Sequence, residues 1–134
     1  MIPRIPVKKV MSTALHALPP QSPAAEAARL MCEKGVGSVL VSDGAQFIGI
    51  LTETDLVRKV VAPGLDPSSQ PIETLMSYPV MSIEEDELLN RANEIMGEHQ
   101  IRHLLVTKDG VPVGMVTVRN LLSAVYDWAL RIAL

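Results

Sequence analysis

The sequence predicts a mixed α/β (α+β) fold in which one β-α-β-β-α unit is used twice in tandem. The first observation is an internal repeat. Displacing the chain by 65 residues, the distance from Met11 to Met76, brings Gly49 onto Gly114 without a gap. The second observation is an Asp-Gly pair between two apolar runs in each copy, which is a signal for a β-hairpin. The third is that each hairpin ends in a threonine that opens a helical pattern.

The first copy spans residues 7–62. Ser22 is expected to cap its first helix, with Pro23 at the first helical position, and Gly35 is expected to end that helix. The expected elements are a strand over 15–18, a helix over 23–35, strands over 38–42 and 46–51, and a helix from Thr52 to about Val61.

A linker over 63–71 separates the copies. Its three prolines, one glycine and two serines cannot sustain a helix or a core strand. The second copy spans 72–134, and its acidic run 84–87 suits the start of a helix because of the helix dipole. The expected elements are an extended segment over 78–82, a helix capped near Asp86 that runs to about His99, strands over 104–107 and 111–116, and a last helix from Thr117.

Composition excludes several classes of function. A net charge of −3 and an aromatic content of 3% disfavour nucleic acid as a partner. No apolar run is long enough to span a membrane, and the single cysteine, Cys32, points to a reducing compartment, so we expect a cytoplasmic protein. Three scattered histidines and one cysteine predict no metal site, and no nucleophile stands beside a base, so we expect no enzyme.

The segment Gly49–Asp55 carries the candidate chemistry. Its strand ends at Thr52, and the first turn of the following helix offers unpaired N–H groups and the positive end of the helix dipole. The Thr52 hydroxyl could hold a phosphate oxygen, and Asp55 could accept the hydroxyls of a ribose. The alternative is a capping box, which stabilises a helix by about 1 kcal/mol and carries no function. The return of the pattern at Thr117 favours the functional interpretation.

The order of these motifs, duplicated without a gap, resembles a tandem pair of cystathionine-β-synthase (CBS) domains, also called a Bateman module. The motifs that carry the resemblance are Met-Ser at 11–12 and 76–77, a proline kink, a helix, an apolar strand, Asp-Gly, and Gly-x-x-Thr-x-x-Asp/Asn. The resemblance covers about residues 7–126 and implies two repeats related by a pseudo-twofold axis. It also implies a regulatory module that binds AMP, ADP, ATP or S-adenosylmethionine, and a homodimer that signals to an effector protein in trans.

The resemblance implies two ligand clefts, each built from both repeats. The threonines would bind phosphate, the Asp or Asn would bind ribose, and short apolar segments would enclose adenine. One cleft would combine Thr52, Thr54 and Asp55 with Ser77, Tyr78, Val80, Met81 and Ile101. The other would combine Thr117, Arg119 and Asn120 with Ser12, Leu15, His16, Ala17 and Val36.

The second cleft departs from the pattern at Asn120, where an amide replaces the carboxylate. A hydrogen bond to a charged group contributes about 1.5–3 kcal/mol and a neutral one about 1 kcal/mol, so we expect the Asp55 cleft to bind more tightly. Arg102, His103 and Arg119 either contact phosphate or lie in solvent. Arg58 and Lys59 are expected to be a solvated helix end.

Two alternatives to an adenine-nucleotide sensor stay open. One is a structural dimerisation module whose clefts bind no ligand, and the other is an S-adenosylmethionine binder. The last helix carries an apolar stripe that continues beyond the end of the repeat and includes Trp128 there. This extension packs either on the core or on a second subunit. The stripe consists of Leu121, Val125, Trp128 and Ile132.

Overall fold

The computed structural model describes residues 3–133, and the chain divides into two compact units. The central unit is residues 16–80, and the terminal unit joins the segment before residue 16 to the segment after residue 80. We call residues 7–15 and 72–80 the lead-in segments of the two sequence repeats. Each unit therefore contains the body of one repeat and the lead-in segment of the other.

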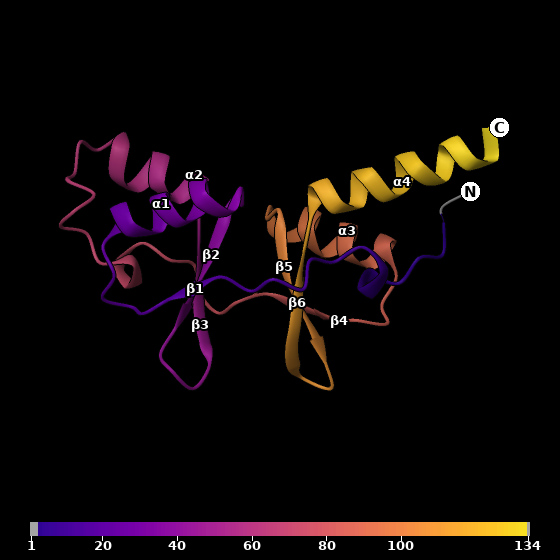
Figure 1. Ribbon diagram of the computed structural model, residues 1–134, viewed down its shortest axis with the longest axis horizontal. Coiled ribbons are helices and arrows are strands. Elements are labelled where there is room, and N and C mark those ends of the chain that lie inside the picture. Colours follow the sequence, from indigo (N-terminus) through magenta and orange to yellow (C-terminus); the bar gives the residue numbers. More distant parts are fainter. Residues whose placement is uncertain (1–2, 134) are drawn as a thin grey trace. The chain divides into compact units, whose positions relative to one another are not determined.

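The central unit is a three-stranded sheet with helices packed against it (Figure 1). Strand β1 is parallel to β2, and β3 is antiparallel to β2. The four-residue helix α2 continues directly into a π-helical turn, η2. The elements are β1 (Ala17–Leu18), α1 (Ala24–Lys34), β2 (Ser38–Ser42), β3 (Phe47–Thr52), α2 (Glu53–Leu56), η2 (Val57–Val61) and the 3-10 turn η3 (Ile72–Thr74).

The terminal unit repeats this plan with a longer last helix. Strand β4 is parallel to β5, and β6 is antiparallel to β5. Helices α3 and α4 contact each other and lie next to this sheet (Figure 1). The elements are the 3-10 turn η1 (Val7–Lys9), β4 (Ser82–Glu84), α3 (Leu89–His99), β5 (His103–Lys108), β6 (Val111–Thr117) and α4 (Val118–Ala133). The mixed α/β fold with a duplicated unit is confirmed.

Each lead-in segment inserts an aliphatic side chain into the core of its unit. Val7 and Ile72 are both 0% exposed, and they belong to the buried clusters of the terminal and the central unit, respectively. Fully burying such a side chain contributes about 1.5–3 kcal/mol. Each lead-in segment is therefore a structural part of the unit that contains it.

The predicted caps of α1 and α3 are wrong. Helix α1 begins at Ala24 without a side-chain cap from Ser22, because Ala24 donates its N–H to the Gln70 carbonyl over 2.8 Å. Helix α3 begins at Leu89, which donates its N–H to the Ile5 carbonyl over 2.9 Å. Asp86 instead pairs with Lys8 at 2.6 Å. Backbone carbonyls from distant segments satisfy these helix ends, and local sequence does not reveal them.

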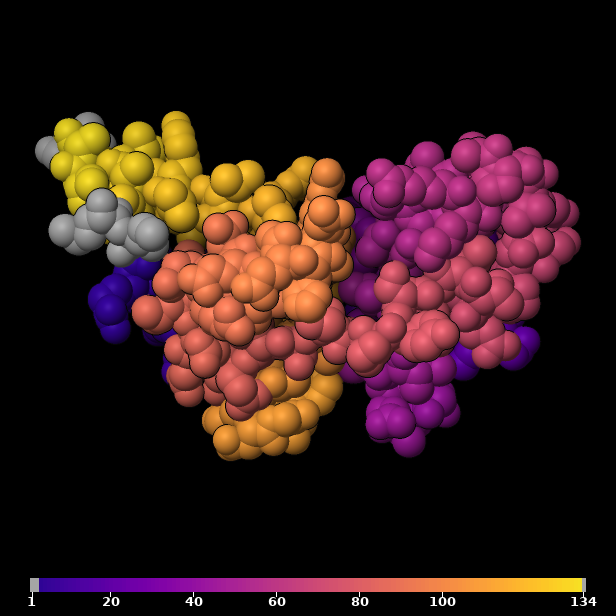
Figure 2. Space-filling view, turned by 180° about the vertical axis from the view of Figure 1, so that it is seen from behind, coloured from indigo at the N-terminus to yellow at the C-terminus, as the bar shows by residue number. Residues whose placement is uncertain are grey.

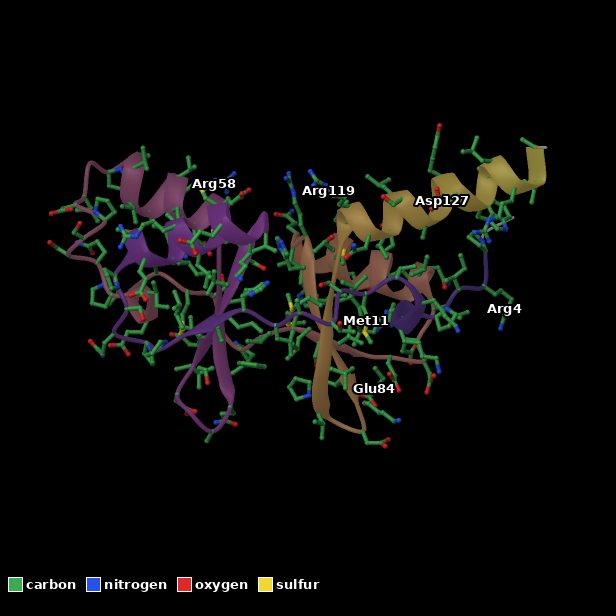
Figure 3. All side chains as sticks on the ribbon, in the orientation of Figure 1. Arg4, Met11, Arg58, Glu84, Arg119 and Asp127 are labelled. Carbon is green, nitrogen blue, oxygen red and sulfur yellow. The ribbon has the colours of Figure 1, made fainter. Side chains whose placement is uncertain are left out.

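The acidic run 84–87 does not start a helix, since Glu84 ends strand β4. Its carboxylate accepts hydrogen bonds from the Thr107 hydroxyl and from the N–H groups of Asp109 (2.8 Å) and Gly110 (3.4 Å). These donors, with Thr107 foremost, lower the pKa of Glu84. Glu84 thereby ties β4 to the β5–β6 hairpin, whose tip projects from the terminal unit (Figures 2 and 3).

Candidate functional site

The junction between β3 and α2 is a complete capping box. Asp55 Oδ2 accepts hydrogen bonds from the Thr52 N–H (2.9 Å) and from Thr52 Oγ1 (3.1 Å). The Asp55 N–H in turn donates to Thr52 Oγ1 over 3.2 Å. Asp55 is buried, whereas Thr54 is exposed and has no side-chain hydrogen bond within the described part of the chain. The predicted cap is therefore present, and it leaves Asp55 Oδ1 and the Thr54 hydroxyl outside the box.

Lys59 holds the second oxygen of Asp55. Its Nζ lies 3.1 Å from Asp55 Oδ1 and donates a hydrogen bond to the Leu75 carbonyl over 2.7 Å. Although Lys59 is exposed, it is not a freely solvated helix end as its position near the end of the helix predicted. The contact could have been predicted from the four-residue spacing between Asp55 and Lys59, since Asp and Lys at i and i+4 lie on the same face of a helix.

The second lead-in segment lies along the edge of β3, two residues before Thr52. Ile50 and Ser77 exchange both backbone hydrogen bonds, at 3.0 and 2.9 Å. The segment approaches closely because Gly49 has no side chain: a Cβ there would collide with Sδ and Cγ of Met76. The lead-in segment of the second repeat is thus placed beside the Thr-x-x-Asp of the first. Tyr78, the next residue, is 74% exposed.

The terminal unit builds the same junction with a neutral side chain. Asn120 Oδ1 accepts hydrogen bonds from the Thr117 N–H (2.9 Å) and Oγ1 (3.0 Å), and the Asn120 N–H donates to Thr117 Oγ1 over 3.2 Å. Ala124 occupies the repeat position that corresponds to Lys59. The capping geometry is therefore equivalent, but the charge and its lysine partner are both missing from this junction.

The first lead-in segment lies along β6 in the equivalent place. Ser12 and Met115 exchange both backbone hydrogen bonds at 2.8 Å. A Cβ at Gly114 would lie 2.6 Å from the Ser12 carbonyl oxygen and 2.8 Å from Met11 Sδ. Figure 3 shows Met11 beside β6. Both glycines are thus required by close approach of a neighbouring chain segment.

Three basic or titratable residues surround the start of α4. The Val118 N–H donates to the Arg102 carbonyl over 3.1 Å, and His103 is paired with Thr117 in the sheet. Arg119 is exposed and extends from the first turn of α4 away from β6 (Figure 3). The terminal junction therefore carries exposed positive charge from Arg119. The first turn of α2 instead carries the acids Glu53 and Asp55.

The other predicted ligand residues are divided between the two units. The terminal unit also holds the half-buried Leu15, Met81 and Ile101. The central unit also holds Val80 and three residues expected in the Asn120 cleft, namely His16, Ala17 and Val36. The assembly of residues from both repeats' bodies into one cleft stays a prediction.

A shallow hollow in the central unit lies away from the junction. Of the predicted ligand residues only Ala17 lines it, beside Pro19, Pro20 and the turn residues Asp43 and Gly44. The turn follows the end of β2 at Ser42, whereas Ser38, at the other end of β2, is paired with Thr52. The hollow therefore does not belong to the Thr52–Asp55 junction.

Apolar side chains are exposed at equivalent positions of both repeats. Val57 (58%) corresponds to Leu122 (67%), and Val61 (70%) corresponds to Tyr126 (65%). Of the stripe predicted on α4, only Leu121 is buried, while Trp128 is half-buried and the other two members are exposed. Most of this stripe therefore does not pack on the core of its own unit.

Residues 3–133 contain neither a metal cluster nor a membrane-spanning helix. No group of three or more His, Cys, Asp or Glu side chains there is arranged to hold a metal ion. Within the same residues, no helix has the length and apolar character needed to cross a membrane.

Comparison with known proteins gives matches over nearly the whole chain. The family model described as "CBS domain" matches residues 7–62 and again 72–127. An uncharacterised protein of Methanopyrus kandleri is 41% identical over 106 residues, which are 78% of this chain and 54% of the relative. The chain thus spans about half the length of that relative.

Two solved structures are similar over almost their whole length. A protein with CBS domains from Burkholderia ambifaria has a TM-score of 0.88 at 28% identity, over 92% of this chain and 95% of that one. An uncharacterised conserved protein from Pyrococcus horikoshii has a TM-score of 0.84 at 34% identity, over 92% of this chain and 94% of that one.

Proposed function

Because the chain belongs to the CBS-domain family and carries two tandem copies of the domain, we propose that it is a regulatory module that binds AMP, ADP or ATP. The observation that carries the proposal is the pair of equivalent junctions. In each, a threonine and an acid or amide open a helix, and a Met-Ser lead-in segment lies hydrogen-bonded two residues upstream. We expect no catalytic activity and a cytoplasmic location.

The roles of the site residues follow from their chemistry. Thr54 and Arg119 occupy equivalent repeat positions and are both exposed, so they are the residues to contact phosphate. Asp55 and Asn120 are the residues to contact ribose hydroxyls, and the charged carboxylate is the stronger acceptor. We therefore expect unequal occupancy, with the Asp55 site the tighter one for the ribose. Phosphate should add more affinity at the terminal junction because Arg119 lies there.

The test is a thermal-shift panel of AMP, ADP, ATP, NAD(H) and S-adenosylmethionine on the wild type and on Asp55→Ala. A ligand at about 100 times its dissociation constant adds about 2.7 kcal/mol. For a domain of this size, that raises Tm by roughly 4 °C or more. Asp127→Ala removes an exposed carboxylate on α4 and is the matched control. A shift that is reduced in Asp55→Ala and kept in Asp127→Ala supports the proposal, and a panel without any shift refutes it.

A structural dimerisation module is the second candidate. The observation in its favour is that both capping boxes are satisfied internally, while apolar side chains on α4 and η2 are exposed. We propose that these surfaces contact a second copy of the chain or an effector protein, with or without ligand. An S-adenosylmethionine binder is favoured by the acids in the first turn of α2, which suit a cationic ligand better than a phosphate.

A further inference from the structure

Lys59 contacts the Asp55 oxygen that a ribose ligand would use. Asp55 Oδ2 already accepts two hydrogen bonds from Thr52, so Oδ1 is the oxygen available to a ligand. Lys59 Nζ lies 3.1 Å from this oxygen, and the Asp55 side chain is only 12% exposed. The oxygen that would accept a ribose hydroxyl is therefore already engaged by the ammonium group.

We propose that Lys59 is a positioning residue that closes the central site, and that a ribose ligand binds by displacing its ammonium from Asp55. The inference rests on the proposed function, because it assigns a gate to that same site. It names a residue outside the Thr-x-x-Asp motif and gives it a role opposed to binding. Lys59 thus lowers the affinity of the Asp55 site and reduces its advantage over the Asn120 site.

The second contact of Lys59 links this gate to the lead-in segment. The same ammonium group donates a hydrogen bond to the Leu75 carbonyl over 2.7 Å, and Leu75 is 5% exposed. The next two residues lie along β3, where Ser77 is bonded to Ile50. Displacing Lys59 from Asp55 therefore removes the counter-ion of an ammonium group that also joins η2 to the lead-in segment.

The other repeat supplies an internal comparison. Asn120 makes the same three capping contacts as Asp55, and Ala124 stands where Lys59 does. The carboxylate and the lysine thus occur together in one repeat and are replaced together in the other. A neutral amide needs no counter-ion, so this pattern indicates that Lys59 is present to compensate the charge of Asp55.

The binding test compares adenosine with ATP by calorimetry on the wild type, Lys59→Met and Lys59→Arg. Met keeps the apolar stem and removes the charge, whereas Arg keeps the ion pair. We expect Lys59→Met to bind adenosine about two- to fivefold more tightly, as the range for single ion pairs of this exposure implies. Lys59→Arg should stay close to the wild type. The double variant Asp55→Asn with Lys59→Ala should give the central site an adenosine affinity similar to that of the Asn120 site.

Two outcomes of the binding test overturn the proposal. If Lys59→Met weakens ATP and leaves adenosine unchanged, Lys59 contacts phosphate and is not a gate. If Lys59→Met changes neither ligand although the wild type binds both, the ion pair has no effect on binding.

A labelling test separates failure of the gate from failure of the proposed function. Lysine acylation followed by peptide mass spectrometry compares Lys59 with Lys34, an exposed lysine of the same unit. Without ligand, we expect Lys59 to react more slowly than Lys34, and Asp55→Asn to remove that difference. Equal rates in the wild type refute the gate whatever binds. Slow labelling of Lys59 in a chain that binds no adenosyl compound refutes the proposed function alone. Bound adenosine should raise the labelling of Lys59, and bound adenosine without this rise also refutes the gate.

Discussion

Replacing Gly114 by Ala should test whether the first lead-in segment is an integral part of the terminal unit. The new Cβ would lie 2.6 Å from the Ser12 carbonyl oxygen, which belongs to the backbone and cannot rotate away. Relief requires the segment to move from β6 and weakens the two 2.8 Å hydrogen bonds between Ser12 and Met115. Each such bond contributes about 1 kcal/mol. We therefore expect a loss of about 2–3 kcal/mol from the free energy of unfolding, with overpacking included.

Two other glycines calibrate this result. At Gly49 the worst collision is with the Met76 side chain, while the Ser77 carbonyl oxygen lies 3.1 Å away, so the side chain can give way. Gly49→Ala should thus cost less, about 1–2 kcal/mol. Gly97 lies within α3, and a Cβ added there would meet no heavy atom within 4 Å beyond its own helix backbone and chain neighbours. Gly97→Ala should therefore stabilise the protein by about 0.5–1 kcal/mol.

The assay is urea denaturation of the three variants and the wild type, followed by circular dichroism. The expected order of stability is Gly97→Ala, wild type, Gly49→Ala and Gly114→Ala. A Gly114→Ala variant as stable as the wild type would refute the reasoning. It would mean that the contact between the first lead-in segment and β6 is not maintained in solution.

Three further predictions concern charge and assembly. The lowered pKa of Glu84, held down first by the Thr107 hydroxyl, means that its contribution to stability is full above the ordinary value of 4.5 and is lost as pH falls below it. Glu84→Gln should therefore flatten the fall in Tm between neutral pH and acid, measured by melts across that range; an unchanged profile would contradict this. Arg119→Ala should weaken the binding of ATP more than that of adenosine in calorimetry, and it should make ATP binding less dependent on salt. Equal losses of affinity for both ligands would argue against a phosphate contact. The double variant Leu122→Asp with Tyr126→Asp should convert the proposed homodimer to monomers, as measured by light scattering. A dimer that persists would place the interface elsewhere.

Much of the fold was predictable because it depends on local patterns. The 65-residue repeat, the Asp-Gly hairpins and the left-handed Gly35 that ends α1 all follow from short stretches of sequence. The Thr52 and Thr117 junctions could also be located from sequence, since a capping box has a fixed spacing of three residues. The ligand contacts of these junctions stay predictions, because their chemistry was carried over from the family.

Tertiary structure alone decided which segments complete each unit. Ser22 and Asp86 have the chemistry of helix caps, yet carbonyls of Gln70 and Ile5 accept the N–H groups that open α1 and α3. Those partners are dozens of residues away in sequence, and no periodicity encodes such contacts. Lys59 illustrates the same limit: its spacing from Asp55 predicts an ion pair, but its bond to the Leu75 carbonyl exists only because the second lead-in segment folds back onto the central unit.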